Sequence, residues 1–284
     1  MPKRRLDLLL VLRGLCPSRE RARASIMAGL VLVNGRPVTK PGEMVEEGAE
    51  LVLRGEACPY VSRGGLKLEW ALDAFRVSVE GRVALDVGAA TGGFTDCLLR
   101  RGAKLVYAVD VGYGQLAWKL RQDPRVVVKE RTNIRYLQAR DLPLPPTLAV
   151  IDASFISLEK FLGHVLTLLS PPREVVALVK PQFEAGREQV GKKGVVRDPA
   201  VHRQVLQKVV ALAEREGCTV QGLTYSPLLG PEGNIEFFLH LAAPGEGPEG
   251  CPGPDLEERI AAVVAEAHAR LRRGGGGKGV PSEK

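Results

Sequence analysis

The chain has 284 residues, of which 45% are hydrophobic and 26% charged, with a formal net charge of +7. This composition fits a soluble globular protein with one large core and a small additional module. No apolar run approaches the roughly 20 residues that a membrane span needs, and no signal peptide is recognisable, so we expect no membrane partner. The cysteines are odd in number and scattered, which predicts free thiols in the cytoplasm and no metal or disulfide site. They are Cys16, Cys58, Cys97, Cys218 and Cys251.

Residues 1–54 predict a small α+β domain. Ser18 is placed to cap a helix over Arg19–Ala28. Asn34-Gly35 lies between apolar residues and indicates a tight hairpin, because both turn positions accept a positive φ. The other expected elements are a helix over Leu6–Arg13 and strands over Val31–Val33, Arg36–Val38 and Glu50–Leu53. Residues 55–62 contain Gly, Cys and Pro and are expected to form a linker.

The positive charge is concentrated at the start of the chain. Residues 1–40 hold nine Lys and Arg residues against two acids, and nine minus two equals the whole net charge of +7. Such concentration indicates a polyanionic partner, most simply a nucleic acid. A solvated basic surface is the alternative interpretation.

The stretch Ala84–Thr95 indicates a nucleotide-binding α/β unit. An apolar strand over Val83–Val87 leads into small residues, and a helix begins near Thr95. The next strand, Leu105–Val109, ends at an acid suited to ribose hydroxyls. The residues expected to contact the cofactor are Asp86, Gly88, Ala89, Thr91, Gly92, Gly93, Phe94 and Asp110, with Asn133 as a candidate for the adenine side.

Two cofactor classes fit this loop. Gly88-x-Ala90-x-x-Gly93 nearly satisfies the dinucleotide fingerprint, so an NAD-dependent dehydrogenase is an alternative. Asp86 favours S-adenosylmethionine, because a carboxylate attracts the cationic methionine end of that molecule. Asp86 could instead be an acid satisfied by loop N–H groups, and Phe94 could serve only to pack the loop onto its helix.

The rest of the chain alternates strands and helices, which predicts a mostly parallel sheet covered on both faces. The last two strands follow each other directly, which predicts an antiparallel edge. The further strands expected are Val126–Val128, Thr147–Ile151, Glu174–Val179, Thr219–Tyr225 and Ile235–Leu241, and the helices are Gly114–Arg121, Leu158–Leu169 and Pro199–Glu216. Residues 244–284 are expected to form a Pro/Gly linker, an Asp255-capped helix packed on the core and a disordered tail from Gly274.

Charged residues follow several strands at the edge where open α/β sheets bind ligands. Asp152 comes directly after one strand and Lys180 directly after the next, while Glu236 lies in the last strand expected. A lysine straight after a buried strand needs a partner, and Asp152 could provide it as a structural ion pair. Lys67 follows Ser62 in the helix before the glycine loop and could simply face solvent.

Two resemblances connect these observations. Residues 4–53, with S-R-E-R-A-R-A-S-I-M-A-G-L-V-L-V-N-G, resemble the αL RNA-binding motif of a ribosomal small-subunit protein, some pseudouridine synthases and tyrosyl-tRNA synthetases. That resemblance implies phosphate contacts by Arg4, Arg19, Arg21 and Arg23, and we add Arg63, which precedes the Lys67 helix. Such contacts supply affinity rather than sequence choice.

Residues 4–243 resemble the haemolysin A (TlyA) family, whose catalytic domain is similar to the FtsJ RNA methyltransferase. The motifs are V-S-R-G-G-L-K-L, D-V-G-A-A-T-G-G-F-T-D, Y-A-V-D-V-G-Y-G-Q-L, E-R-T-N-I-R, I-D-A-S-F-I-S-L, V-K-P-Q-F-E and G-N-I-E-F-F. The resemblance implies a Rossmann-like methyltransferase domain over residues 63–243. It also implies S-adenosylmethionine-dependent methylation of cytidine ribose 2′-hydroxyls in ribosomal RNA. The family's catalytic tetrad falls on Lys67, Asp152, Lys180 and Glu236.

Two rival functions differ in class from this one. The chain could be a non-catalytic RNA-binding assembly factor, although an intact tetrad argues against that role. It could be a membrane-damaging protein, as the family's historical name suggests, although no export signal or surface-inserting helix is evident. The modified nucleotide, the ribosomal subunit and the oligomeric state are open at this point, because base choice depends on RNA shape.

Overall fold

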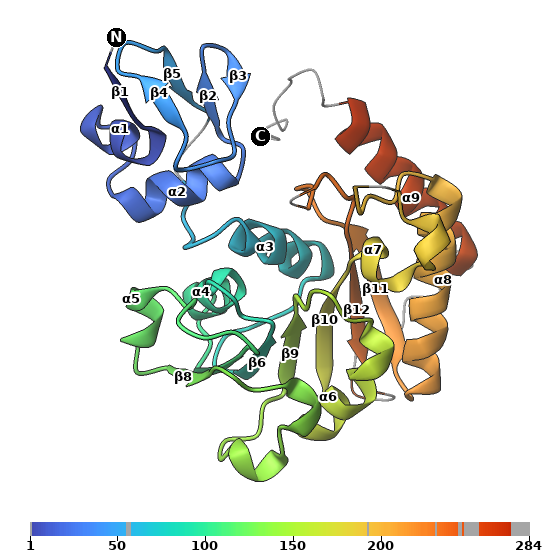
Figure 1. Ribbon diagram of the computed structural model, residues 1–284. Helices are drawn as coiled ribbons and strands as arrows, with labels where there is room; N and C mark the ends of the chain where they lie inside the picture. Colours follow the sequence, from blue (N-terminus) through green and yellow to red (C-terminus); the bar gives the residue numbers. More distant parts are fainter. Residues whose placement is uncertain are drawn as a thin grey trace.

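The computed structural model describes residues 2–54, 58–191, 193–230, 232–243, 246 and 256–273. Figure 1 shows a small N-terminal part above a larger α/β part, with α3 lying between them. Several features expected from the sequence lie outside the described residues. These are the first part of the linker, most of the Pro/Gly segment after residue 243, the Asp255 cap, Cys251 and the tail from Gly274.

The small part is an α+β unit, as predicted. Two helices, α1 (Leu6–Leu12) and α2 (Arg19–Met27), pack beside a three-stranded sheet in the order β3-β2-β5. The strands are β2 (Val31–Val33), β3 (Arg36–Pro37) and β5 (Leu51–Leu53), and the sequence did not indicate the additional pair β1 (Lys3–Arg5) and β4 (Met44–Glu46). The Asn-Gly hairpin is confirmed, with φ of 49° at Asn34 and 76° at Gly35. The Ser18 hydroxyl accepts from the Arg21 N–H, which confirms the cap.

The larger part is built on a seven-stranded sheet in the order β11-β12-β10-β9-β6-β7-β8. All neighbouring strands from β10 to β8 run parallel, and β12 is antiparallel to both of its neighbours. The antiparallel strand therefore lies one position in from the edge. The strands are β6 (Val83–Val87), β7 (Leu105–Val109), β8 (Val126–Lys129), β9 (Leu148–Ile151), β10 (Glu174–Val179), β11 (Thr219–Tyr225) and β12 (Phe237–Ala242).

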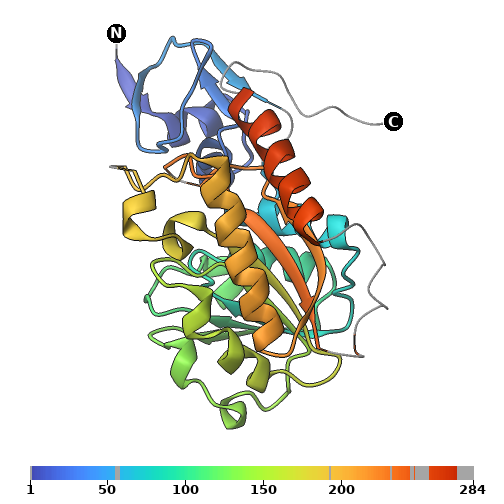
Figure 2. The same ribbon diagram turned by 90° about the vertical axis from the view of Figure 1, so that its right-hand side faces the viewer.

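Helices cover both faces of this sheet. One face packs against α3 (Gly64–Phe75), α4 (Gly93–Arg100) and α5 (Trp118–Arg121). The other packs against α6 (Leu162–Leu168) and α8 (Pro199–Arg215), and Figure 2 shows α9 (Leu256–Arg273) beside α8. The apolar stripe of α9 is buried in this second core, as expected, because Ile260, Val264 and Ala267 are at most 1% exposed.

Two expected helices are shorter than their sequence patterns. In place of one helix over Leu158–Leu169, a 3₁₀ turn (Leu158–Lys160) precedes α6, and Phe161 between them is non-helical, with φ of −152°. The helix expected from Gly114 begins only at Trp118, because Ala117 is non-helical with ψ of 139°. The remaining short elements are α7 (Pro181–Glu184) and 3₁₀ turns at Ile134–Tyr136, Ala139–Asp141 and Arg187–Gln189.

Candidate active site

Two adjoining cavities lie at the carboxyl ends of the central strands. The first has a volume of about 540 Å³ and the second about 460 Å³. They share a boundary made by the loop after β6 and the loop after β9, namely Gly88, Ala90, Asp152, Ser154 and Phe155. This is the edge where open α/β sheets bind ligands, so molecules in the two cavities would meet at the loop boundary.

The glycine loop is packed so closely that two of its positions admit no side chain. Gly88 has φ of +87°, and a Cβ there would lie 2.8 Å from the Asp152 carbonyl oxygen. A Cβ on Gly93 would lie 2.9 Å from the backbone nitrogen of Gly65 in α3. The glycines therefore let the loop lie against both the end of β9 and the start of α3.

Seven of the nine residues expected to contact the cofactor line one or both cavities. Asp110 and Asn133 line the second cavity, where the Asp110 carboxylate accepts from the N–H groups of Ala90 (2.9 Å) and Gly112 (2.6 Å). The loop residues that line the first cavity are Gly88, Ala89, Thr91, Gly93 and Phe94. Phe94 is nevertheless only 2% exposed and stacks on Phe238, so it also packs the loop onto the sheet. Gly92 lines neither cavity.

Asp86 lies beneath the loop and also lines neither cavity. Its side chain is fully buried, one oxygen accepts from the Thr95 hydroxyl at 2.6 Å, and the other has no partner among the described residues. Burial raises the pKa of Asp86 to about 7, and the nearby carboxylates of Asp152 and Asp110 act in the same direction. A direct contact between Asp86 and the cofactor stays a prediction, and it would require access from beneath the loop.

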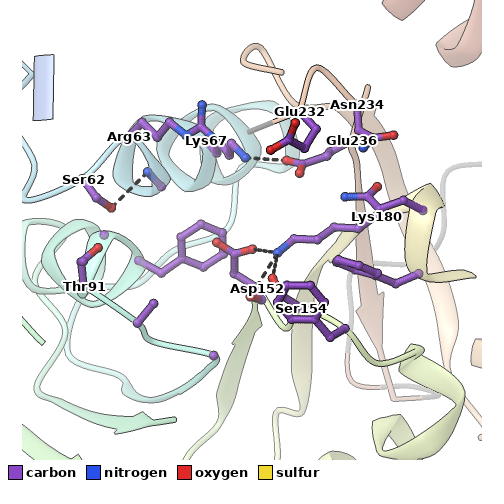
Figure 3. Close-up of a pocket in the computed structure, with 18 of the residues that line it drawn as sticks. Ser62, Arg63, Lys67, Thr91, Asp152, Ser154, Lys180, Glu232, Asn234 and Glu236 are labelled. Atoms are coloured by element: carbon purple, nitrogen blue, oxygen red, sulfur yellow. Dashed lines mark hydrogen bonds and ion pairs between the residues drawn. The ribbon is translucent and has the colours of Figure 1, made fainter. Parts of the chain in front are cut away.

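The four residues of the expected tetrad form two ion pairs that line the first cavity (Figure 3). Lys67, from α3, donates to Glu236 Oε2 at 2.5 Å, and the two side chains are 5% and 1% exposed. The partners are 169 residues apart in the sequence, so this pair joins α3 to the segment that leads into β12.

Lys180 and Asp152 form the second pair, below the first in Figure 3. The Lys180 Nζ lies 2.6 Å from Asp152 Oδ1 and donates to the Ser154 hydroxyl at 2.8 Å. The Asp152 side chain is 25% exposed, so this pair is more open to the cavity than the first. The structure thus brings all four sequence-predicted residues together, as two lysine–carboxylate pairs from four separate elements.

The loop after β9 carries a feature that the sequence analysis missed. Phe155 is 90% exposed, has a positive φ of 64° and lines both cavities. Its ring lies 5.1 Å from that of Phe183 in α7. Such a backbone conformation is strained for a bulky residue and persists only when neighbouring contacts impose it.

Glu184 supplies such contacts at the far end of the same loop. Its buried carboxylate accepts from the Ser157 hydroxyl at 2.6 Å and from the Leu158 N–H at 2.8 Å. Burial raises the pKa of Glu184 above its usual range. The loops after β9 and β10 are therefore tied together at both ends, by Lys180 near Asp152 and by Glu184 near Ser157. For Phe155, the only sequence signal was an aromatic residue in the short segment that follows a strand.

The arginines expected to bind RNA differ in whether their side chains already have partners within the protein. Arg4 pairs with Glu47 and Arg19 with the buried Asp7. Arg21 donates to the Cys58 carbonyl at 2.5 Å. Arg23 is exposed and makes no ion pair with any described residue, and Arg63 lines the first cavity. Arg23 and Arg63 are thus better placed for phosphate contacts than the other three.

Comparisons with known proteins identify the families of the two domains. The FtsJ-like methyltransferase family model matches residues 60–243, and the S4 domain model matches residues 4–51. "Putative rRNA methyltransferase YqxC" of Bacillus subtilis is 56% identical over 95% of this chain and 96% of its own length. "16S/23S rRNA (cytidine-2'-O)-methyltransferase TlyA" of Mycobacterium tuberculosis is 45% identical over 92% of this chain and 97% of its own. A solved structure, "Putative hemolysin from Streptococcus thermophilus", superposes with a TM-score of 0.75 at 50% identity, covering 96% of this chain and 98% of that one.

The sheet order, the glycine loop and these similarities define a Rossmann-like methyltransferase preceded by an S4 RNA-binding domain. The chain belongs to the FtsJ-like methyltransferase family, in the branch that contains the TlyA relatives. Within the part of the chain that the structure describes, no helix has the length and apolarity to cross a membrane.

Proposed function

We propose that this protein transfers a methyl group from S-adenosylmethionine to the ribose 2′-hydroxyl of a cytidine in ribosomal RNA. The observation that carries the proposal is the pair of cavities that meet at Gly88 and Asp152, one of them lined by two lysine–carboxylate pairs. A relative 45% identical carries the same activity in its name. Residues 63–243 would perform catalysis, and residues 1–54 would dock on the RNA.

The second cavity has the features that S-adenosylmethionine requires. Gly88 of the glycine loop forms part of its wall, and Asp110 and Asn133 supply polar atoms along that wall. An acid after the second strand is suited to accept from ribose hydroxyls. The carboxylates of Asp110 and Asp152 also attract a cationic ligand. When bound, this molecule supplies an electrophilic methyl group on a sulfonium.

The residues of the first cavity would bind the nucleophile, the ribose 2′-hydroxyl, and assist the loss of its proton. A ribose hydroxyl is a weak nucleophile and must lose its proton as its oxygen bonds to the methyl carbon. Lys180 pairs with Asp152, which lies at the boundary of the cavities. We assign Lys180 the role of receiving or stabilising that proton: its neutral amine would accept the proton, and Asp152 would balance the charge of the ammonium that forms. Lys67 and Glu236 would hold the ribose in line with the methyl group, and alignment supplies much of the rate.

The site of action follows from the substrate. Ribosomal RNA is a cytoplasmic partner, and exposed Arg23 together with Arg63 would contact its phosphates. The described cysteines, Cys16, Cys58, Cys97 and Cys218, are all free and buried, which suits a reducing compartment.

The test is transfer of a labelled methyl group to ribosomal subunits from cells that lack this gene. We expect label in ribosomal RNA, with stoichiometric modification at one or a few cytidines. RNA binding without transfer would instead support a non-catalytic assembly factor. Lysis of protein-free liposomes by the pure protein, without RNA labelling, would support a membrane-active function.

A further inference from the structure

The RNA-binding domain contributes a side chain to the catalytic cavity. Met27, the last residue of α2, lines the same cavity as Lys67 and Lys180 and is 36% exposed. The cavity is therefore built from both domains. Its boundary on this side depends on how firmly the S4 domain is attached.

The attachment of α2 is firm. Ala24 belongs to the buried cluster that includes Cys58, Leu68 and Phe94, so α2 shares one hydrophobic core with the methyltransferase domain. The Ser25 hydroxyl accepts from the Cys58 N–H at 3.0 Å, and Arg21 donates to the Cys58 carbonyl. Residues of α2 thus bind both backbone polar groups of Cys58, its N–H and its carbonyl oxygen.

The same segment continues to the catalytic helix. Val61 donates its N–H to Asp96 of α4 at 2.9 Å, and α3, which carries Lys67, begins at Gly64. The position of Met27 relative to Lys67 is therefore fixed by packing and hydrogen bonds. A thioether fixed in this way presents a compact, adaptable apolar surface to whatever enters the cavity.

The placement of Met27 on its helix indicates what it would contact. Arg23 and Met27 are four residues apart on α2, so they share one face about one turn, or 6 Å, from each other. Both are exposed, and Arg63 lines the same cavity as Met27. An RNA strand lying along this face would place a phosphate near Arg23 and the adjoining nucleotide against Met27, inside the cavity.

We propose that Met27 is a positioning residue, through which the RNA-binding domain helps to hold the target nucleotide over Lys67 and Lys180. This inference rests on the proposed function. It predicts that Met27 affects the rate of methyl transfer, because small misplacement of a reacting group is costly. A residue that served only for docking would affect RNA affinity instead.

The experiment compares Met27→Ala with Met44→Ala in the full-length protein, on ribosomal subunits from cells lacking this gene. Met44 is a matched control, since it is 53% exposed in β4 of the same domain and lines neither cavity. We expect kcat to fall about tenfold or more for Met27→Ala, with unchanged RNA affinity and cofactor affinity. Met27→Leu, which keeps the apolar bulk, should restore most of the rate, and Met44→Ala should match the unmodified protein.

Three results would overturn the inference. They are an unchanged kcat in Met27→Ala, a loss confined to RNA affinity, and an equal loss in Met44→Ala. In each case an active unmodified protein leaves the proposed function standing. If the unmodified protein transfers no methyl group to RNA, the proposed function fails and this inference fails with it.

Discussion

The two lysine–carboxylate pairs have the same charges but different surroundings. Lys67 and Glu236 are 5% and 1% exposed, whereas Asp152 in the other pair is 25% exposed and its partner Lys180 also donates to Ser154. A buried pair fixes geometry and is costly to break, while an open pair can exchange protons with a substrate. The difference supports our proposal that the first pair positions the ribose and the second handles the proton.

The largest effect should come from Lys180. We expect Lys180→Ala to reduce the single-turnover rate of methyl transfer by about 10²–10⁴-fold, the range typical of losing a general acid or base. Cofactor affinity, measured by calorimetry, should be unchanged, because Lys180 does not line the second cavity, which we assign to the cofactor. Lys160→Ala, at an exposed lysine outside both cavities, is the charge-matched control. Full activity in Lys180→Ala would remove the distinction between the pairs.

The second prediction concerns stability and compares the two carboxylates. Glu236→Ala should lower the free energy of unfolding by about 3–5 kcal/mol, because it leaves the Lys67 ammonium buried without its partner. Asp152→Ala should cost clearly less, since Lys180 keeps its hydrogen bond to Ser154 and is closer to solvent. Urea titrations at one pH measure both losses. Equal losses would show that the burial difference has no energetic consequence.

Asp86 is a third carboxylate near the site. It lies beneath the glycine loop and has no lysine partner among the described residues. Its pKa of about 7 in the folded protein lies above the ordinary value of 3.8. Between these two pKa values the folded state therefore keeps a proton that the unfolded state loses. The contribution of Asp86 to the free energy of unfolding is fully present below about pH 4 and is lost as the pH rises toward 7. At about 1.4 kcal/mol for each pH unit, the difference between 3.8 and about 7 gives an upper estimate of about 4 to 5 kcal/mol for this fall.

Asp86→Asn should remove this dependence. The variant should match the unmodified protein near pH 4 and be more stable by up to a few kcal/mol at pH 8. Denaturant titrations of the cofactor-free protein between pH 4 and 8 provide the comparison. Parallel stability curves for the two proteins would contradict the assigned protonation state.

Much of the fold could be predicted because its signals are local. The seven strands coincide with apolar runs to within about two residues, and the Asn34-Gly35 hairpin formed as its turn chemistry requires. The predictions failed where contacts between distant segments, rather than the local sequence, determine the secondary structure. The helix expected over Leu158–Leu169 is interrupted at Phe161, and the strand pair β1–β4 has only three residues in each strand, too few for a periodic pattern.

The site was predictable for a different reason. The four charged residues were assigned through motifs that resemble a known family, and the structure places them around one cavity. Phe155 and Met27 were missed, because neither residue type indicates which cavity it lines. The positive φ of Phe155 and the docking of α2 against Cys58 arise from contacts between segments far apart in the sequence.

The most direct test of the central claim is whether the methyl group is placed on a ribose oxygen. Alkaline cleavage of RNA requires a free 2′-hydroxyl, so a methylated ribose leaves a missing band in a hydrolysis ladder. Ribosomal RNA treated with the protein and S-adenosylmethionine should show such a gap immediately after a cytidine, and RNA treated with Lys180→Ala should not. Methyl incorporation with an uninterrupted ladder would place the group on a base and contradict the account.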